Sequence, residues 1–229
     1  MSKLILLRHG QSVWNQENRF TGWMDVALSP KGEQEAREAG RMLARAGFGP
    51  GFCFVSYLKR AVKTLWLALE EMDLMWLPVS KTWRLNERHY GALQGMDKDF
   101  AANKYGHEQV QAWRRGYRQL PPGLEPGDAN NPALDPRYAE VTNPPLAESL
   151  ELTVRRVLPC WREQIAPVLS CGQDVLVCAH GNSLRGLVMH LRDIPEQEIP
   201  GFELPTGLPL VFRLDSQLKL QQSYFLQKD

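Results

Sequence analysis

Two histidines of this 229-residue chain follow an apolar stretch directly and are themselves followed by glycine. The stretch 3–7 leads into His9, and the stretch 175–179 leads into His180. If both stretches are neighbouring parallel strands, their carboxyl ends meet at the edge where open α/β sheets bind ligands. A neutral imidazole can attack phosphorus and carry the phosphoryl group covalently. The two positions therefore predict one site, although a single histidine at a strand end is also compatible with a structural role.

Two arginines are expected beside these histidines. Arg8 directly precedes His9, and a charge next to a buried strand is costly without an anionic partner. Arg60 falls in the first turn of the helix expected after the strand 52–55, where the helix dipole disfavours a cation unless an anion binds there. Arginine matches phosphate bidentately, and a protonated His180 can stabilise charge on the transferring oxygens. This set favours phosphoryl transfer; an exposed Arg60 is the alternative.

Other phosphate and ester chemistries leave signatures that this sequence lacks. There is no G-x-S-x-G nucleophile elbow and no G-x-x-x-x-G-K-[ST] phosphate loop. Clustered carboxylates near the histidines, which a metal phosphatase needs, are absent, and the four cysteines form no C-x-x-C pair. We therefore expect no metal site.

Composition narrows the class of protein. The chain has 27 basic and 26 acidic residues, and 43% of its residues are hydrophobic, so it is neither broadly basic nor disordered. No apolar run approaches 18 residues, and the N-terminal apolar run is too short for a signal peptide. We expect a cytoplasmic protein that acts on a small molecule, with no nucleic-acid or membrane partner.

Expected strands and helices alternate along the chain, which predicts a single α/β domain over residues 1–229. Its mostly parallel sheet should carry helices on both faces. We expect strands at 3–7, 52–55, 79–85 and 175–179, a hairpin over 210–225, and helices at 30–46, 58–72, 98–117 with a break at Gly106, 150–169 with a bend at Pro159, and from Gly181 to Arg192.

Residues 121–145 interrupt this alternation. The segment contains seven prolines and two glycines, which predicts an irregular insertion within the domain. A long irregular segment in a compact domain often covers a functional site. We expect it near the active site; a passive surface loop is the alternative.

Seven segments together resemble the 2,3-bisphosphoglycerate-dependent phosphoglycerate mutases of the histidine phosphatase superfamily. NERHYG and WRRG are the more specific motifs, because they separate the mutases from the general phosphatases of the superfamily. The resemblance runs through most of the chain, from about Lys3 to Phe225, and the segments are RHGQSVWN (8–15), RFTGW (19–23), SYLKRAVKTLW (56–66), LNERHYGALQG (85–95), AWRRGY (112–117), AHGNSLRGL (179–187) and PTGLPLVF (205–212).

The resemblance implies an isomerase of glycolysis and gluconeogenesis that interconverts 2-phosphoglycerate and 3-phosphoglycerate. It implies 2,3-bisphosphoglycerate as the priming cofactor, no metal, a phosphoglycerate mutase-like fold and a possible homodimer. His9 would be the phosphorylated nucleophile and Glu87 the group that exchanges the proton. The transferring phosphoryl group would be held by Arg8, Asn15, Arg60 and His180; further hydrogen bonds would come from Ser12, Thr21, Gly22, Gly181 and Asn182; and the far end of the substrate would be gripped by Tyr90, Lys98, Arg114 and Arg115.

Several alternatives stay open at this point. Gln11 replaces a glutamate of many relatives, and the chain ends soon after Phe225, where many relatives continue into a tail that closes over the site. The second expectation is therefore a phosphomonoesterase of the same superfamily, and the third is a module that only binds phosphometabolites. Glu87 could instead be a structural partner of a neighbouring arginine. Arg114 and Arg115 could instead belong to a solvated helix face.

Overall fold

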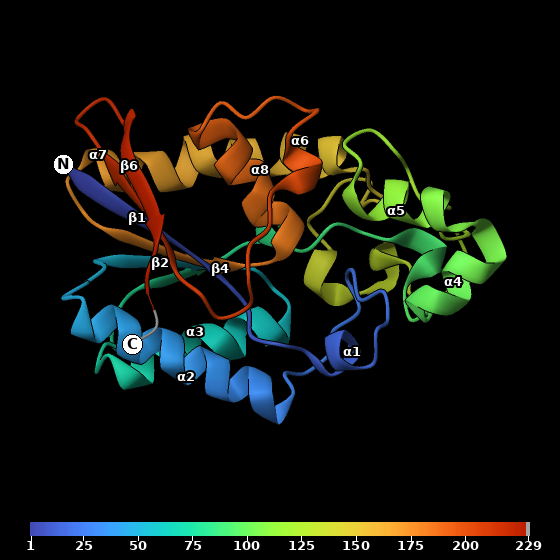
Figure 1. Ribbon diagram of the computed structural model, residues 1–229, viewed down its shortest axis with the longest axis horizontal. Helices are drawn as coiled ribbons and strands as arrows, with labels where there is room; N and C mark the ends of the chain where they lie inside the picture. The colour runs from blue at the N-terminus through green and yellow to red at the C-terminus, as the bar shows by residue number, and fades with distance from the viewer. Residues whose placement is uncertain (228–229) are drawn as a thin grey trace.

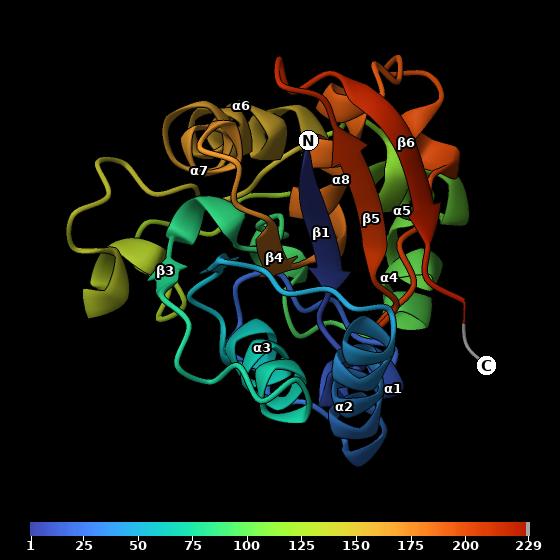
Figure 2. The same ribbon diagram turned by 90° about the vertical axis from the view of Figure 1, so that its left-hand side faces the viewer.

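The protein is described by a computed structural model covering residues 1–227. It contains a six-stranded sheet with helices on both faces (Figure 1). The spatial order is β3-β2-β4-β1-β5-β6; the first four are parallel, and β5 is antiparallel to both neighbours (Figure 2). This confirms the predicted mostly parallel α/β sheet. The strands are β1 (Ser2–Arg8), β2 (Phe52–Val55), β3 (Val79–Lys81), β4 (Val175–Ala179), β5 (Leu210–Leu214) and β6 (Leu220–Phe225).

Two helical layers enclose the sheet (Figures 1 and 2). One layer contains α2 (Pro30–Arg45) and α3 (Lys59–Glu71); the other contains α6 (Leu150–Cys160), α7 (Ala166–Ser170) and α8 (Gly181–Leu191). The Ser29 hydroxyl caps α2 and Pro30 occupies its first turn, as the sequence predicts. Within residues 1–227, no helix is both long and apolar enough to cross a membrane.

Strand β1 is apolar from Leu4 to Leu7 because both of its faces are covered there. Ile5 and Leu7 join the core under α2 and α3, whereas Leu4 and Leu6 join the core under α6 and α8. All four side chains are fully buried. A strand between two helical layers thus forms a continuous apolar run instead of an alternating one.

The central strands β1 and β4 bring the two His-Gly pairs together. They pair in parallel, with Arg8 opposite Ala179 at the last register position, and the His9 amide donates to the Ala179 carbonyl at 3.0 Å. His9 and His180 therefore leave adjacent strands at the same edge. The expectation that the two strands are neighbours is confirmed.

A smaller group of elements lies beyond the carboxyl ends of these strands (Figure 1). It contains α1 (Val13–Gln16), α4 (Lys98–Tyr105) and α5 (His107–Arg115). Phe20, Leu93 and Trp113 form its own small core with Ala101 and Val110. The predicted break between α4 and α5 falls at Gly106, whose φ is +89°. These elements are thus packed separately from the main cores of the sheet.

Two predicted elements end earlier than expected. Strand β3 stops at Lys81, because its neighbour β2 pairs Val55 with Lys81 and ends there. A 3-10 turn, η1 (Trp83–Leu85), follows. The helix expected over 150–169 is divided after Cys160 by a π-helical turn, η5 (Trp161–Ile165). Pro159 lacks an N–H and disturbs the helical ladder just before that turn.

Residues 121–145 contain two short 3-10 turns, η3 (Pro132–Leu134) and η4 (Pro136–Tyr138). Buried Tyr138 anchors the segment: its ring lies 4.7 Å from that of Trp23, and its hydroxyl accepts a 2.9 Å bond from Asn86. The segment is therefore attached to residues close to Glu87 in the chain. Its role as a cover stays a prediction.

Candidate active site

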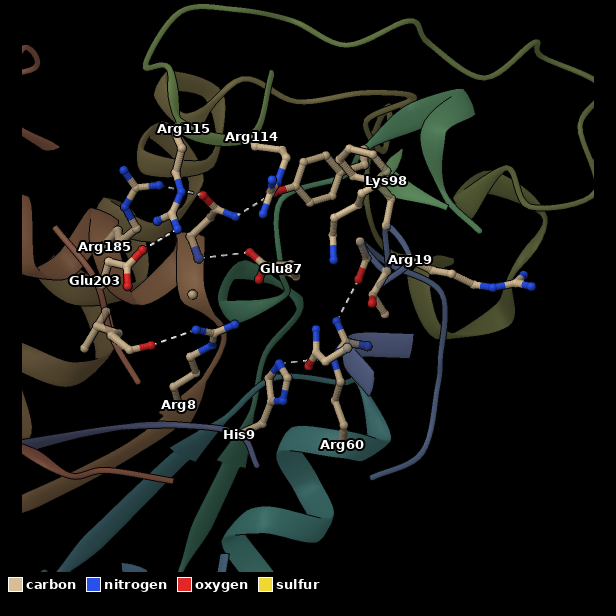
Figure 3. Close-up of a pocket in the computed structure, with 18 of the residues that line it drawn as sticks. Arg8, His9, Arg19, Arg60, Glu87, Lys98, Arg114, Arg115, Arg185 and Glu203 are labelled. Atoms are coloured by element: carbon tan, nitrogen blue, oxygen red, sulfur yellow. Dashed lines mark hydrogen bonds and ion pairs between the residues drawn. The ribbon is translucent and has the colours of Figure 1, made fainter. Parts of the chain in front are cut away.

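His9 lies at the bottom of a pocket at the carboxyl ends of β1 and β4 (Figure 3). Its Nδ1 is 2.7 Å from the Gly10 carbonyl oxygen, and a carbonyl only accepts, so Nδ1 carries the proton. Nε2 then keeps its lone pair and lies 3.3 Å from the Arg60 Nε. Burial, Arg60 and Arg8 hold the pKa of His9 well below its ordinary value. The ring is therefore neutral at neutral pH, and hydrogen bonds at both of its nitrogens fix its orientation.

Arg60 connects His9 to the loop before α2. It is 1% exposed and donates to the carbonyl oxygens of Gly22 at 2.8 Å and Met24 at 2.9 Å. Gly22 has a φ of +55°, and a Cβ there would come within 2.1 Å of the Gln94 amide oxygen. Burial lowers the pKa of Arg60 to about 10, so it stays charged at neutral pH. The predicted position in the first turn of α3 is confirmed.

Arg8 extends from the end of β1 into the same pocket. Its Nη1 donates to the Leu204 carbonyl at 2.7 Å, but its buried Nε has no partner among residues 1–227. Burial lowers its pKa, and the charge of Glu87 opposes that effect. A buried donor without a partner is costly, so an anion in the pocket would stabilise this side chain.

His180 is fully buried beside His9, with the ring centroids 4.9 Å apart. Its Nε2 is 2.7 Å from the hydroxyl oxygen of Ser56, at the end of β2. Burial first, then Arg60, lowers its pKa well below the ordinary value. A phosphoryl dianion would counter the arginine field and favour the protonated ring that the sequence suggests.

Glu87 lies between His9 and the cations on the far wall of the pocket (Figure 3). Its Oε1 accepts the backbone N–H of Asn182 at 3.0 Å and of Arg88 at 2.9 Å. Its carboxylate thus meets the first turn of α8, the positive end of that helix. Oε2 has no hydrogen bond from the described residues, and Gly181, which lacks a side chain, leaves space beside it. Oε2 is therefore available to a ligand hydroxyl.

A buried ion pair supports the segment that carries Glu87. Arg156 contacts both Glu148 oxygens, at 2.6 and 2.9 Å, and donates to the backbone carbonyls of Arg84 and Glu87 at 2.7 and 2.8 Å. Glu148 also accepts the His89 amide at 2.8 Å. The pair thus holds residues 84–89 at both ends through backbone bonds.

A second set of cations lies across the pocket from His9 (Figure 3). Lys98 is at the start of α4, Arg114 and Arg115 are in the last turn of α5, and Arg185 is on α8. Burial, followed by Arg114 and Arg8, lowers the pKa of Lys98 to about 8. Burial also lowers the pKa of Arg185 to about 10. These charges repel one another, so an anion between them would be stabilised.

Buried Arg88 positions the end of α5. Its guanidinium donates to the backbone carbonyl of Arg114 and to the hydroxyl of Tyr90 at 3.2 Å. The guanidinium carbon of Arg88 lies 4.9 Å from the centre of the Tyr90 ring. Arg88 thus connects the Glu87 segment to the helix that presents Arg114 and Arg115.

The structure brings most of the predicted site residues into one pocket, whose lining contains Arg8, His9, Asn15, Thr21, Gly22, Arg60, Glu87, Tyr90, Lys98, Arg114, Arg115, Gly181 and Asn182. His180 lies behind His9. Ser12 instead caps α1: its hydroxyl accepts the Asn15 amide at 3.1 Å, and the Asn15 side chain accepts the Ser12 amide. Phosphate binding by Ser12 stays a prediction. Gln11 faces the Ser29 hydroxyl, 2.9 Å away.

The sequence reading missed Arg19, Phe20, Arg185 and the segment 202–204, which also line the pocket. Arg185 had a usable signal, since it is four residues after Gly181 and so on the same face of the expected helix. Arg19 adjoins the predicted Thr21 and Gly22. The segment 202–204 carries no local pattern that indicates a site.

The pocket fits the bisphosphate that the sequence resemblance implies. Buried atoms without partners among residues 1–227 occur on both sides, at Arg8 Nε and Arg185 Nε, and also at Thr21 Oγ1. No carboxylate of the described residues pairs with Arg114 or Lys98. Hydrogen-bond donors without acceptors and positive charges without carboxylate partners thus occur at two separate places in the pocket. A ligand with two anionic groups needs such donors and charges at both places.

Comparisons with known proteins agree with this fold. The family model described as "Histidine phosphatase superfamily (branch 1)" matches residues 4–131 and 129–217. A mycobacterial glucosyl-3-phosphoglycerate phosphatase complexed with VO3 has 22% sequence identity and a TM-score of 0.75, with 98% of this chain and 97% of that chain covered. YhfR of Bacillus stearothermophilus has 20% identity and a TM-score of 0.72, with 96% and 95% covered.

Proposed function

The chain belongs to the histidine phosphatase superfamily (branch 1), and from this membership we propose that it is a phosphoglycerate mutase that works through a phosphohistidine at His9. Its substrates would be 2-phosphoglycerate and 3-phosphoglycerate, and 2,3-bisphosphoglycerate would supply the first phosphoryl group. The superfamily accounts for phosphoryl transfer; the choice of isomerase rests on the geometry of the pocket.

One observation supports the isomerase above all: the cations form two sets with Glu87 between them (Figure 3). Arg8 and Arg60 flank His9, and Lys98, Arg114 and Arg115 face them. Phosphoglycerate carries a phosphate and a carboxylate, and the bisphosphate carries two phosphates. Both sets together would hold the two anionic groups of these ligands.

In the proposed reaction, His9 carries the phosphoryl group and Glu87 carries the proton of the substrate hydroxyl. His9 transfers its phosphoryl group to the free hydroxyl of the monophosphate: the P–N bond breaks, a P–O bond forms, and the hydroxyl proton passes to Glu87 Oε2. The bisphosphate then reorients within the pocket, so that its other phosphate faces His9. His9 Nε2 then attacks the other phosphorus, and Glu87 returns its proton to the departing alkoxide oxygen. Arg8, Arg60 and His180 would stabilise the charge on the transferring oxygens.

A phosphomonoesterase of the same superfamily is the second candidate. The similar mycobacterial structure is named a phosphatase. The His9 end of the pocket also contains a nucleophile, two arginines and a carboxylate that could activate water instead of a substrate hydroxyl. Access of water to the phosphohistidine therefore decides between transfer and hydrolysis.

The test measures both products in one reaction. The protein is incubated with 3-phosphoglycerate and a trace of 2,3-bisphosphoglycerate, with enolase reporting 2-phosphoglycerate and a second assay reporting inorganic phosphate. We expect isomerisation that depends on priming and exceeds phosphate release. Phosphate release in excess would instead support the phosphomonoesterase. Turnover that persists in His9→Asn would contradict both candidates.

A further inference from the structure

The segment 199–204 starts with η6 (Ile199–Gly201), precedes β5 in the chain, and is held by arginines of the pocket. Arg185 donates to the Ile199 carbonyl, and Arg8 donates to the Leu204 carbonyl at 2.7 Å. Ile199 and Leu204 are both buried. The segment is therefore fixed at two points, and Glu203 lies between them at the rim.

Glu203 forms an ion pair with Arg115 (Figure 3). The Glu203 side chain is 68% exposed and that of Arg115 is 31% exposed. Among the described lining residues, the other carboxylate is Glu87, whose Oε1 is already bonded by two backbone amides.

We propose that Glu203 is an internal competitor for the substrate: its carboxylate occupies the Arg115 guanidinium that would otherwise bind the second anionic group of the ligand. The inference rests on the proposed function, because it takes the far cation set as the site of that group. Binding then requires the Glu203–Arg115 pair to separate. A ligand anion that binds Arg115 must displace the Glu203 carboxylate and is also repelled by its negative charge.

The competition predicts selectivity between ligands. A ligand with two anionic groups reaches both cation sets and encounters Glu203, whereas inorganic phosphate binds beside His9 without contact with Arg115. The ion pair is partly exposed and therefore weak, but relief of the repulsion adds to its loss, so removing the charge of Glu203 should change affinity by about threefold to tenfold. Glu203 would thus weaken the binding of the bisphosphate and favour its release.

The test is calorimetric binding of 2,3-bisphosphoglycerate and of inorganic phosphate to the full chain, with no need for turnover. Glu203→Gln should lower the Kd of the bisphosphate by about threefold to tenfold and leave that of phosphate within about twofold. Glu196→Gln is the matched control, since Glu196 pairs with Arg118 outside the pocket. It makes the same change in net charge and should leave both Kd values unaltered.

A double-mutant cycle assigns the effect to Arg115. In an Arg115→Ala background, Glu203→Gln should tighten bisphosphate binding much less than in the wild-type protein. Unchanged or weaker bisphosphate binding in the single variant Glu203→Gln would overturn the inference, and so would an equal gain in both backgrounds. Failure of the proposed function appears separately, as absent isomerisation in the primed assay.

Discussion

The two ends of the pocket are built in different ways. The His9 end consists of side chains that leave the central strands or the first turn of α3, and His9, His180 and Arg60 are at most 3% exposed. The far end is carried by α4, α5 and a loop, and the side chain of Arg115 remains 31% exposed. The first end is thus part of the main core, and much of the second is attached to it through a small core of its own.

On the proposed function, the His9 end would carry out phosphoryl transfer and the far end would select the ligand. At the His9 end, hydrogen bonds to backbone carbonyls set the tautomer of His9 and the direction of Arg60. At the far end, the charged groups are less buried, the pKa of Lys98 lies near 8, and Arg115 is paired with the Glu203 carboxylate. Substitutions at the first end should therefore affect rate, and those at the second should affect affinity.

The largest effect is expected for His9→Asn, which replaces the proposed nucleophile with a smaller, uncharged polar side chain. We expect kcat to fall by roughly 10⁴-fold or more. Acid-labile labelling of the protein by radiolabelled 2,3-bisphosphoglycerate should also disappear. His107→Asn, at an exposed position of α5, is the control and should retain both signals. Normal labelling of His9→Asn would place the phosphoryl acceptor elsewhere.

Arg156→Ala should give the next largest effect, this time on stability. It leaves the buried Glu148 carboxylate without its partner, which costs about 3–5 kcal/mol of unfolding free energy. Arg118→Ala, which removes the exposed pair with Glu196, should cost less than about 1 kcal/mol. Urea unfolding measures both. Equal costs would show that the Arg156–Glu148 pair gains nothing from its burial.

Arg115→Ala should act on affinity. Loss of a charged hydrogen-bond donor costs about 1.5–3 kcal/mol, so KM for 3-phosphoglycerate should rise by about 10-fold to 100-fold. The inhibition constant of inorganic phosphate, which needs only the His9 end, should change little. If the phosphate constant rises as much as KM, the two ends do not bind separate groups.

The smallest effect concerns the pH dependence of KM. Lys98, with a pKa of about 8, is charged below that pH and neutral above it. An anionic substrate is attracted only by the charged form, so KM should increase as the pH rises from 7 to 9.5, by less than about tenfold. Lys98→Arg keeps its charge over this range and should flatten the profile. An equally steep profile in that variant would exclude Lys98 as its cause.

Local patterns account for much of the fold and for the His9 end. The run from Leu4 to Leu7 is apolar at every position, which indicates a strand buried on both faces. The Ser29-Pro30 start of α2 follows from capping chemistry. Element ends were less predictable: β3 stops where β2 no longer pairs with it, and that pairing involves residues distant in the chain.

The sequence by itself determined that two His-Gly pairs end buried strands and that arginines accompany them, because burial and periodicity are encoded over a few neighbouring residues. Only the tertiary structure decided which charges meet across the pocket. Arg115 and Glu203 are 88 positions apart, and Glu87 and Asn182 are 95 positions apart. Such contacts depend on how separate elements pack, and no local spacing of residue types specifies that packing.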